Sequence, residues 1–145
     1  MVAKIKRNDI YILAKQELFV NGFVKYIAKK THVLPVNRGG HDTTTIKESI
    51  KILKNNHALV IFPEGTRKGI EKNKKLHKGA VVIADSLGVP IIPVGINSKF
   101  KLFSKVKVNY GKPIEFESKK LNKNEIEEKT EELKEIIINL TNDSF

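Results

Sequence analysis

Residues Ala58 to Arg67 read ALVIFPEGTR, five apolar residues followed by a proline and a short polar segment. An apolar run of this length that ends at a turn residue is typical of a strand buried inside a parallel sheet. We therefore expect a buried strand from Ala58 to Phe62. It would end at Pro63 and bring a carboxylate, a hydroxyl and a guanidinium to the rim of the sheet, where α/β proteins usually bind anionic ligands.

Strands and helices alternate along the rest of the chain. The sequence predicts strands at 9–14, 33–36, 58–62, 89–96 and 105–110, and helices around 18–27, 43–55, 78–87 and 123–140. Helices of about ten residues between strands imply right-handed crossovers. The expected fold class is α/β, with a largely parallel sheet covered by helices.

The helix ends and faces are also predicted from local patterns. For the helix near 43–55, we expect an N-cap at Asp42 or within Thr43 to Thr45, with Thr45 and Glu48 at the spacing of a capping box. Gly88 is expected to end the next helix. The apolar stripes predicted to face the sheet are Ile46, Ile50 and Leu53 in the first of these helices, and Ile126, Leu133, Ile137 and Leu140 in the last.

Length and composition predict one domain over residues 1–145, with the acidic helical segment 118–145 packed on it. The chain has 145 residues, 40% hydrophobic content and no cysteine, so burial rather than disulfides must hold the fold. The longest apolar runs fall far below the ~18 residues that a membrane-spanning helix needs.

The net charge of +11 is unevenly distributed, because residues 118–145 carry −2 and residues 1–117 carry +13. Such a basic body attracts polyanions and anionic bilayer surfaces. The alternative is a lysine-rich solvated surface without a specific partner.

Three cations are expected at one edge of the sheet. Arg67 follows the strand at 58–62, Arg38 follows the strand at 33–36, and Lys15 follows the first strand. The carboxyl ends of parallel strands share one rim, so these side chains can converge on a single phosphate, with Glu64 beside them. For each cation alone, an ion pair or a solvent-exposed position is the simpler reading.

Several segments resemble the glycerolipid acyltransferases, in particular the bacterial 1-acyl-sn-glycerol-3-phosphate acyltransferases. The segments that carry the resemblance are Ile12 to Phe19, Leu34 to Arg38, Phe62 to Arg67, Lys78 to Ala80 and Val89 to Val94. Phe62 to Arg67 matches its block without a change, whereas Asn37 stands where the family usually has Asp. Ordered matches at fitting spacings are more specific than any single one of them.

The resemblance implies acyl transfer from a coenzyme A or acyl-carrier-protein thioester to lysophosphatidate, giving phosphatidate, without a metal or other cofactor. It implies a peripheral position on an anionic membrane surface, at the cytoplasmic, inner face of the cell membrane. The implied substrate-binding residues are Lys15, Arg38, Glu64, Gly65, Thr66 and Arg67.

The family's catalytic pair is a His followed five positions later by an Asp, in which the His acts as the general base. None of the four histidines here has an Asp at that spacing, so the catalytic set is empty. The resemblance implies that this block, with the first strand and helix, lies upstream of Met1. On this interpretation the chain is truncated and inactive alone, and its exposed sheet edge promotes self-association.

Two alternatives remain open at this point. One is a non-catalytic module that binds phospholipid head groups or other anions on the same basic rim. The other is a nucleic-acid binder, which rests on charge alone, because no nucleic-acid motif is present and aromatic residues are not interleaved with the basic ones. No nucleotide-binding loop is indicated, and His and carboxylates do not recur at metal-ligand spacings.

Overall fold

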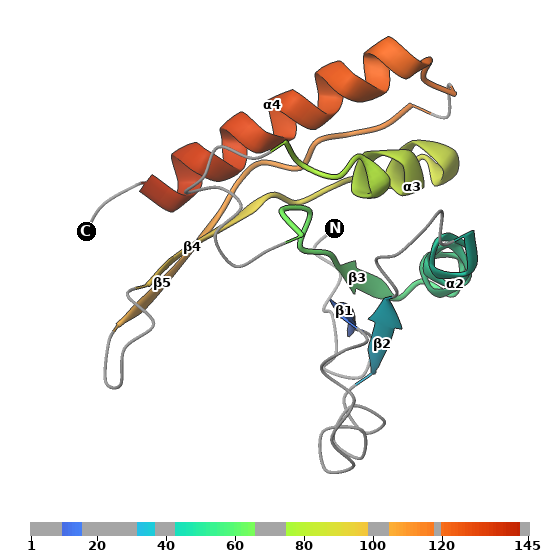
Figure 1. The fold of residues 1–145 in the computed structure, drawn as a ribbon, viewed down its shortest axis with the longest axis horizontal. Coiled ribbons are helices and arrows are strands. Elements are labelled where there is room, and N and C mark those ends of the chain that lie inside the picture. The colour runs from blue at the N-terminus through green and yellow to red at the C-terminus, as the bar shows by residue number, and fades with distance from the viewer. Residues whose placement is uncertain are drawn as a thin grey trace. The chain divides into compact units, whose positions relative to one another are not determined.

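The computed structural model describes residues 10–15, 32–36, 43–65, 75–98, 105–117 and 120–142 (Figure 1). The chain divides into two compact units, Met1–Phe62 and Pro63–Phe145, and each is described here by itself. The helix expected around 18–27 lies outside the described residues. In the described part of the chain, no helix is long and apolar enough to cross a membrane.

The first unit is built on a parallel sheet of β1 (Ile10–Lys15), β2 (Val33–Val36) and β3 (Ala58–Val60). The strand order is β2-β1-β3, and β1 is parallel to both neighbours. In the register, Lys15 lies opposite Val36 and Ile12 lies opposite Val60. The predicted strands at 9–14 and 33–36 and their parallel pairing are confirmed.

Helix α2 (Thr43–Lys54) packs against β3 with a face that differs from the predicted one. Ser49 is completely buried and Ile52 is buried, whereas Ile46 is 37% exposed. Ile50 and Leu53 of the predicted stripe are half-buried, whereas the prediction was wrong for Ile46, because the small serine rather than this isoleucine occupies the centre of the packed face. The capping box was also wrong, since Thr45 is the third residue of the helix. Asp42 lies outside the described residues.

Strand β3 is shorter than the apolar run that predicted it. It ends at Val60, and Val60 and Phe62 are 37% and 53% exposed, so the prediction of a buried strand through Phe62 was wrong. Its partner β1 pairs with it only from Ile10 to Ile12, which leaves Ile61 and Phe62 without a strand pairing. The chain then turns at Pro63, which has no N–H to donate to a ladder.

The second unit contains α3 (Gly79–Leu87), β4 (Val94–Ser98), β5 (Val106–Tyr110) and α4 (Lys123–Asn142). Gly88 ends α3 in the left-handed conformation with φ 62°, as predicted. Strands β4 and β5 form an antiparallel ribbon, and the half-exposed strand expected at 105–110 is confirmed. Its apolar residues are the exposed ones, whereas Lys107 and Asn109 are half-buried. The strand predicted from Val89 begins only at Val94, after Pro90 and Pro93, because proline cannot donate to the ladder.

The core of the second unit lies between α4, α3 and the segments that flank the ribbon. Ile126, Leu133 and Ile137 of α4 are buried, as predicted, and Leu140 is half-buried. An unpredicted capping box begins α4: Asn122 Oδ1 accepts from the Glu125 N–H, and Glu125 Oε2 accepts from the Asn122 N–H. The buried residues of the core are Leu76, Val81, Ala84, Phe116, Ile126, Leu133 and Ile137.

Helix α4 lies very close to β4 at Gly95. A Cβ atom on Gly95 would stand 2.5 Å from the Leu140 carbonyl carbon, which is closer than real Cβ contacts. Opposite Gly95, Asn109 Nδ2 donates a 2.7 Å hydrogen bond to the Leu140 carbonyl oxygen. The absence of a side chain at Gly95 therefore sets the distance between the ribbon and α4.

We expect Gly95→Ala to lower the free energy of unfolding by about 1–3 kcal/mol, because the added methyl group must push α4 away from β4. The matched control is Gly79→Ala, where a Cβ atom would meet nothing within 4 Å, and this change should be neutral. Urea denaturation followed by circular dichroism measures both variants. Equal stabilities for the two variants would contradict the close packing at Gly95.

Candidate functional site

The carboxyl edge of the first unit's sheet holds the first of the predicted site residues. Lys15 is the last residue of β1 and lies opposite Val36, the last residue of β2. The two strands are parallel and end level, so the chain leaves both of them at one edge of the sheet. Arg38 is two positions beyond Val36 and lies outside the described residues. The structure thus fixes the backbone of Lys15 at this edge.

The turn that follows β3 belongs to the second unit and carries Glu64 and Gly65. Gly65 is buried and has φ 66°, a left-handed conformation that favours glycine. The Pro63 carbonyl oxygen accepts a 2.9 Å hydrogen bond from the His77 N–H, and Glu64 is half-buried. This hydrogen bond ties the turn to the segment that enters α3. Thr66 and Arg67 follow the turn and lie outside the described residues.

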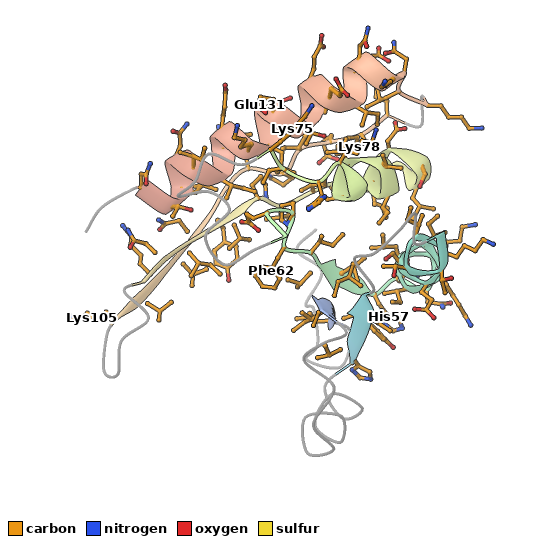
Figure 2. The ribbon with its side chains drawn as sticks, viewed as in Figure 1. His57, Phe62, Lys75, Lys78, Lys105 and Glu131 are labelled. Carbon is orange, nitrogen blue, oxygen red and sulfur yellow. The ribbon has the colours of Figure 1, made fainter. Side chains whose placement is uncertain are left out.

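The segment tied to the turn is basic and leads directly into a helix N-terminus. Lys75 and Lys78 (Figure 2) are exposed. His77 is also exposed, while Leu76 is buried in the core. Lys78 precedes the first turn of α3, where no side chain of the described residues forms a cap. Helix N-termini carry partial positive charge, so the cations and the helix end favour an anion in this region.

Sequence reasoning missed the contribution of Lys75 and Lys78 to this region. The sequence singles out Lys78 only within the segment Lys78 to Ala80 that resembles the acyltransferases, and it does not single out Lys75. The signal that identifies them is the pair of cations that flanks buried Leu76 immediately before the start of α3. The hydrogen bond from His77 to Pro63 then brings that segment to the turn.

Two of the four histidines lie at the other edge of the first unit's sheet. His32 immediately precedes β2 and His57 immediately precedes β3, so both are at the amino ends of the strands. Their rings contact Tyr11, at centroid distances of 4.8 and 5.2 Å. Neither histidine is placed to act on a ligand at the carboxyl edge beside Lys15. His41 lies outside the described residues.

A hollow on α4 does not fit an anionic ligand, and no metal site is apparent in the part of the chain that the structure describes. A hollow of about 260 Å³ on α4 is lined mainly by carboxylates, which repel a phosphate; its lining residues are Leu121, Glu125, Glu128, Lys129 and Glu132. Among the residues that the structure describes, His, Asp and Glu do not gather in groups of three that can hold a metal ion.

The predicted site residues are thus located in two groups. Lys15 stands at the carboxyl edge in the first unit, and Glu64 and Gly65 stand beside the Lys75–Lys78 segment in the second. The convergence of Lys15, Arg38 and Arg67 on one ligand stays a prediction, because both arginines lie outside the described residues.

Comparison with known proteins gives a consistent assignment of fold and family. The chain is similar to the crystal structure of the LPA acyltransferase PlsC from Thermotoga maritima, with a TM-score of 0.67 and 24% identity over 94% of this chain and 58% of that one. This similarity confirms the α/β fold.

Two curated relatives are named 1-acyl-sn-glycerol-3-phosphate acyltransferase. The Bacillus subtilis protein is 37% identical over 73% of this chain and 55% of its own length. The Streptococcus pneumoniae protein is 29% identical over 88% of this chain and 49% of its own length. The chain therefore spans about half the length of the curated relatives it matches.

A family model described as Acyltransferase matches residues 1–97, which include β1, β2, the turn after β3, α3 and most of β4. The match includes both groups of predicted site residues, Lys15 in the first unit and Glu64 and Gly65 in the second. It covers well over half of the 145 residues. The chain belongs to the acyltransferase family.

Proposed function

We propose that this chain supplies the acceptor-binding part of an enzyme that transfers an acyl group to lysophosphatidate and gives phosphatidate. Residues 1–145 act as one acyltransferase-like domain, with the segment 118–145 packed on it. The observation that carries the proposal is that the parallel strands β1 and β2 end side by side, with Lys15 opposite Val36. Lys15 and the segment that leads to Arg38 therefore begin at the same edge of the sheet. The names of the Bacillus subtilis and Streptococcus pneumoniae relatives support the choice of acceptor.

In this proposal the acceptor phosphate binds to a cationic cluster. The guanidinium groups of Arg38 and Arg67 each form two parallel hydrogen bonds to phosphate oxygens, and Lys15 adds a point charge. The Thr66 hydroxyl donates a hydrogen bond to an oxygen of the same phosphate. Glu64 orients the glycerol hydroxyl or holds one of the arginines, and Gly65 allows the backbone to approach the ligand closely.

The reaction joins the free hydroxyl oxygen of lysophosphatidate to the thioester carbonyl carbon. The carbon–sulfur bond breaks, and the hydroxyl proton is transferred, through a base, to the departing thiolate of coenzyme A or a carrier protein. No metal or other cofactor takes part. General-base catalysis typically contributes 10²- to 10⁴-fold in rate. Because none of the four histidines has an Asp five positions later, and because His32 and His57 also lie at the opposite edge of the sheet from Lys15, we expect these 145 residues alone to bind the acceptor and to turn it over slowly.

The proposed setting is the cytoplasmic, inner face of the cell membrane. The balance of +13 in residues 1–117 favours an anionic lipid surface, where the acceptor itself resides. Self-association is a further expectation, because β3 is an edge strand of the described sheet and exposes Val60, with Phe62 exposed two residues beyond its end.

The alternative is a non-catalytic module that binds phospholipid head groups through the same cations. The position of His32 and His57 at the far edge favours this alternative for the chain by itself. Both functions require binding to phosphatidate, but only the enzyme releases a thiol from acyl coenzyme A. A thiol-release assay with lysophosphatidate as acceptor therefore separates the two.

Arg67→Ala should weaken binding to phosphatidate vesicles by roughly 10- to 100-fold, because it removes a charge-assisted, two-pronged contact worth about 1.5–3 kcal/mol. Vesicle sedimentation measures the effect. Arg67→Lys keeps the charge and tests the geometry, whereas Lys51→Ala on α2 removes one exposed charge elsewhere. If Arg67→Ala and Lys51→Ala lose the same affinity, the phosphate role of Arg67 is refuted.

Gly65→Ala should lower the free energy of unfolding by about 1–2 kcal/mol and weaken phosphatidate binding, because alanine resists the φ of 66° in the turn. Gly65→Asn is the matched variant, since asparagine tolerates the left-handed conformation better. Urea denaturation and vesicle sedimentation measure both. A more stable Ala variant than Asn variant would show that space, and not backbone conformation, requires glycine here.

A further inference from the structure

The ribbon of β4 and β5 exposes an apolar face on the side away from α4. Gly95 and Asn109 lie opposite each other and both contact Leu140 of α4. Successive residues of a strand point to opposite faces, so the neighbouring pairs Val94–Tyr110 and Ile96–Val108 point away from α4. The exposed fractions on this face are 38% for Ile96, 57% for Val106, 43% for Val108 and 72% for Tyr110.

The ribbon and its flanking segments carry only positive charge. Between Asp85 and Glu115 the sequence contains five lysines and no acidic residue. Lys105 and Lys112, at the two ends of β5, are exposed, and Figure 2 shows Lys105 at the free end of the ribbon. An apolar face with a lysine at each end of its strand complements a surface whose outer groups are anionic and whose interior is apolar. The lysines would meet the anionic groups, and the apolar side chains would meet the interior.

Helix α4, on the other side of the ribbon, carries the opposite charge. It contains six Glu and three Lys, and Glu131 is 50% exposed even though it pairs with Lys134. The second unit is therefore polarised, with a basic, apolar ribbon on one side and an acidic helix on the other. An anionic surface attracts the first side and repels the second, which fixes the orientation of this unit.

We propose that the exposed face of the β4–β5 ribbon docks on the surface of an anionic phospholipid bilayer, with its apolar side chains in the interface and Lys105 and Lys112 at the head groups. The proposal builds on the proposed function in one respect, because it assigns the membrane contact of that enzyme to a particular surface. A second copy fits this face less well, since two ribbons that each lack acidic residues repel one another. Nucleic-acid binders stack successive bases on several aromatic side chains, whereas Tyr110 is the one aromatic residue among the described residues of this face.

The most direct test uses the absence of tryptophan from the chain. Tyr110→Trp places a single fluorophore on the proposed face, and Ile46→Trp places one at a 37% exposed position of α2. Tryptophan prefers the membrane interface. With vesicles of phosphatidylglycerol and phosphatidylcholine, we expect a blue shift and quenching by brominated lipid for Tyr110→Trp only. Equal responses at both positions, or none at Tyr110→Trp, would overturn the proposal.

Charge and apolar contributions are separated by two further sets of variants. Lys105→Gln and Lys112→Gln should each lower the vesicle partition coefficient about fivefold. Their controls, Lys47→Gln and Lys51→Gln on α2, should change the partition coefficient less than about twofold.

The double variant Val106→Thr and Val108→Thr, which keeps shape and strand propensity, should lower the partition coefficient about tenfold, and Ile46→Thr should leave it unchanged. Equal losses in variants and controls would indicate attraction by net charge alone and refute the docking surface.

Two outcomes would assign the face to other occupants. A dimer in size-exclusion chromatography that Val106→Thr and Val108→Thr dissociate would assign the face to a second copy. A lower denaturation midpoint of the same variant without vesicles would show that the chain itself covers the face. The two proposals fail separately. If the unchanged chain shows no preference for phosphatidate over phosphatidylglycerol vesicles, the proposed function is refuted. If Tyr110→Trp does not respond to phosphatidylglycerol vesicles, the docking surface is refuted.

Discussion

The parallel pairing of β1 with both of its neighbours is the constraint on which the account depends. Parallel strands deliver their following segments to one edge, and the register places Lys15 level with Val36. The segments that follow β1 and β2 therefore start side by side, with a cation at or near the start of each. An antiparallel arrangement of the same strands would send Lys15 and Arg38 to opposite edges, and the shared phosphate would be excluded.

A second constraint acts on the turn after β3. The hydrogen bond between the His77 N–H and the Pro63 carbonyl joins two segments that are separated by 14 positions. Leu76, one residue before, is buried in the core of the second unit, so the turn is linked to well-packed structure. Glu64, Gly65 and the basic segment before α3 are held together in this way. A site of charged side chains needs such support, because its own like charges repel each other.

The sequence predicted those features that depend on local chemistry. Gly88 ends α3 because only glycine readily adopts the left-handed cap, and the alternating residues of β5 give a half-exposed strand. Features that depend on tertiary partners were not predictable. Ser49 is polar, yet it is the best-buried residue of α2, and β3 ends with its pairing to β1 at Val60 rather than at the end of the apolar run. The His77–Pro63 bond uses backbone groups that every position offers, so no residue pattern identifies it.

In the β4–β5 ribbon, too, the sequence predicted the strand but not the face that is buried. The apolar alternation of Val106, Val108 and Tyr110 predicts a strand with one apolar face, but only the contact of Gly95 and Asn109 with Leu140 shows which face α4 covers. The capping box of Asn122 and Glu125 was readable from the sequence, because the two residues stand three positions apart, the spacing of that motif. A local pattern thus shows that a strand has an apolar face, but long-range contacts decide which face is buried.

The central claim is that Arg38 and Arg67 bind the same phosphate, and a double-mutant cycle tests it most directly. The affinity for phosphatidate vesicles is measured for the unchanged chain, Arg38→Ala, Arg67→Ala and the double variant. Side chains that share one ligand should show a coupling free energy of at least about 0.5 kcal/mol. Strict additivity, within about 0.3 kcal/mol, would mean that the two arginines act at separate places and would contradict the shared phosphate site.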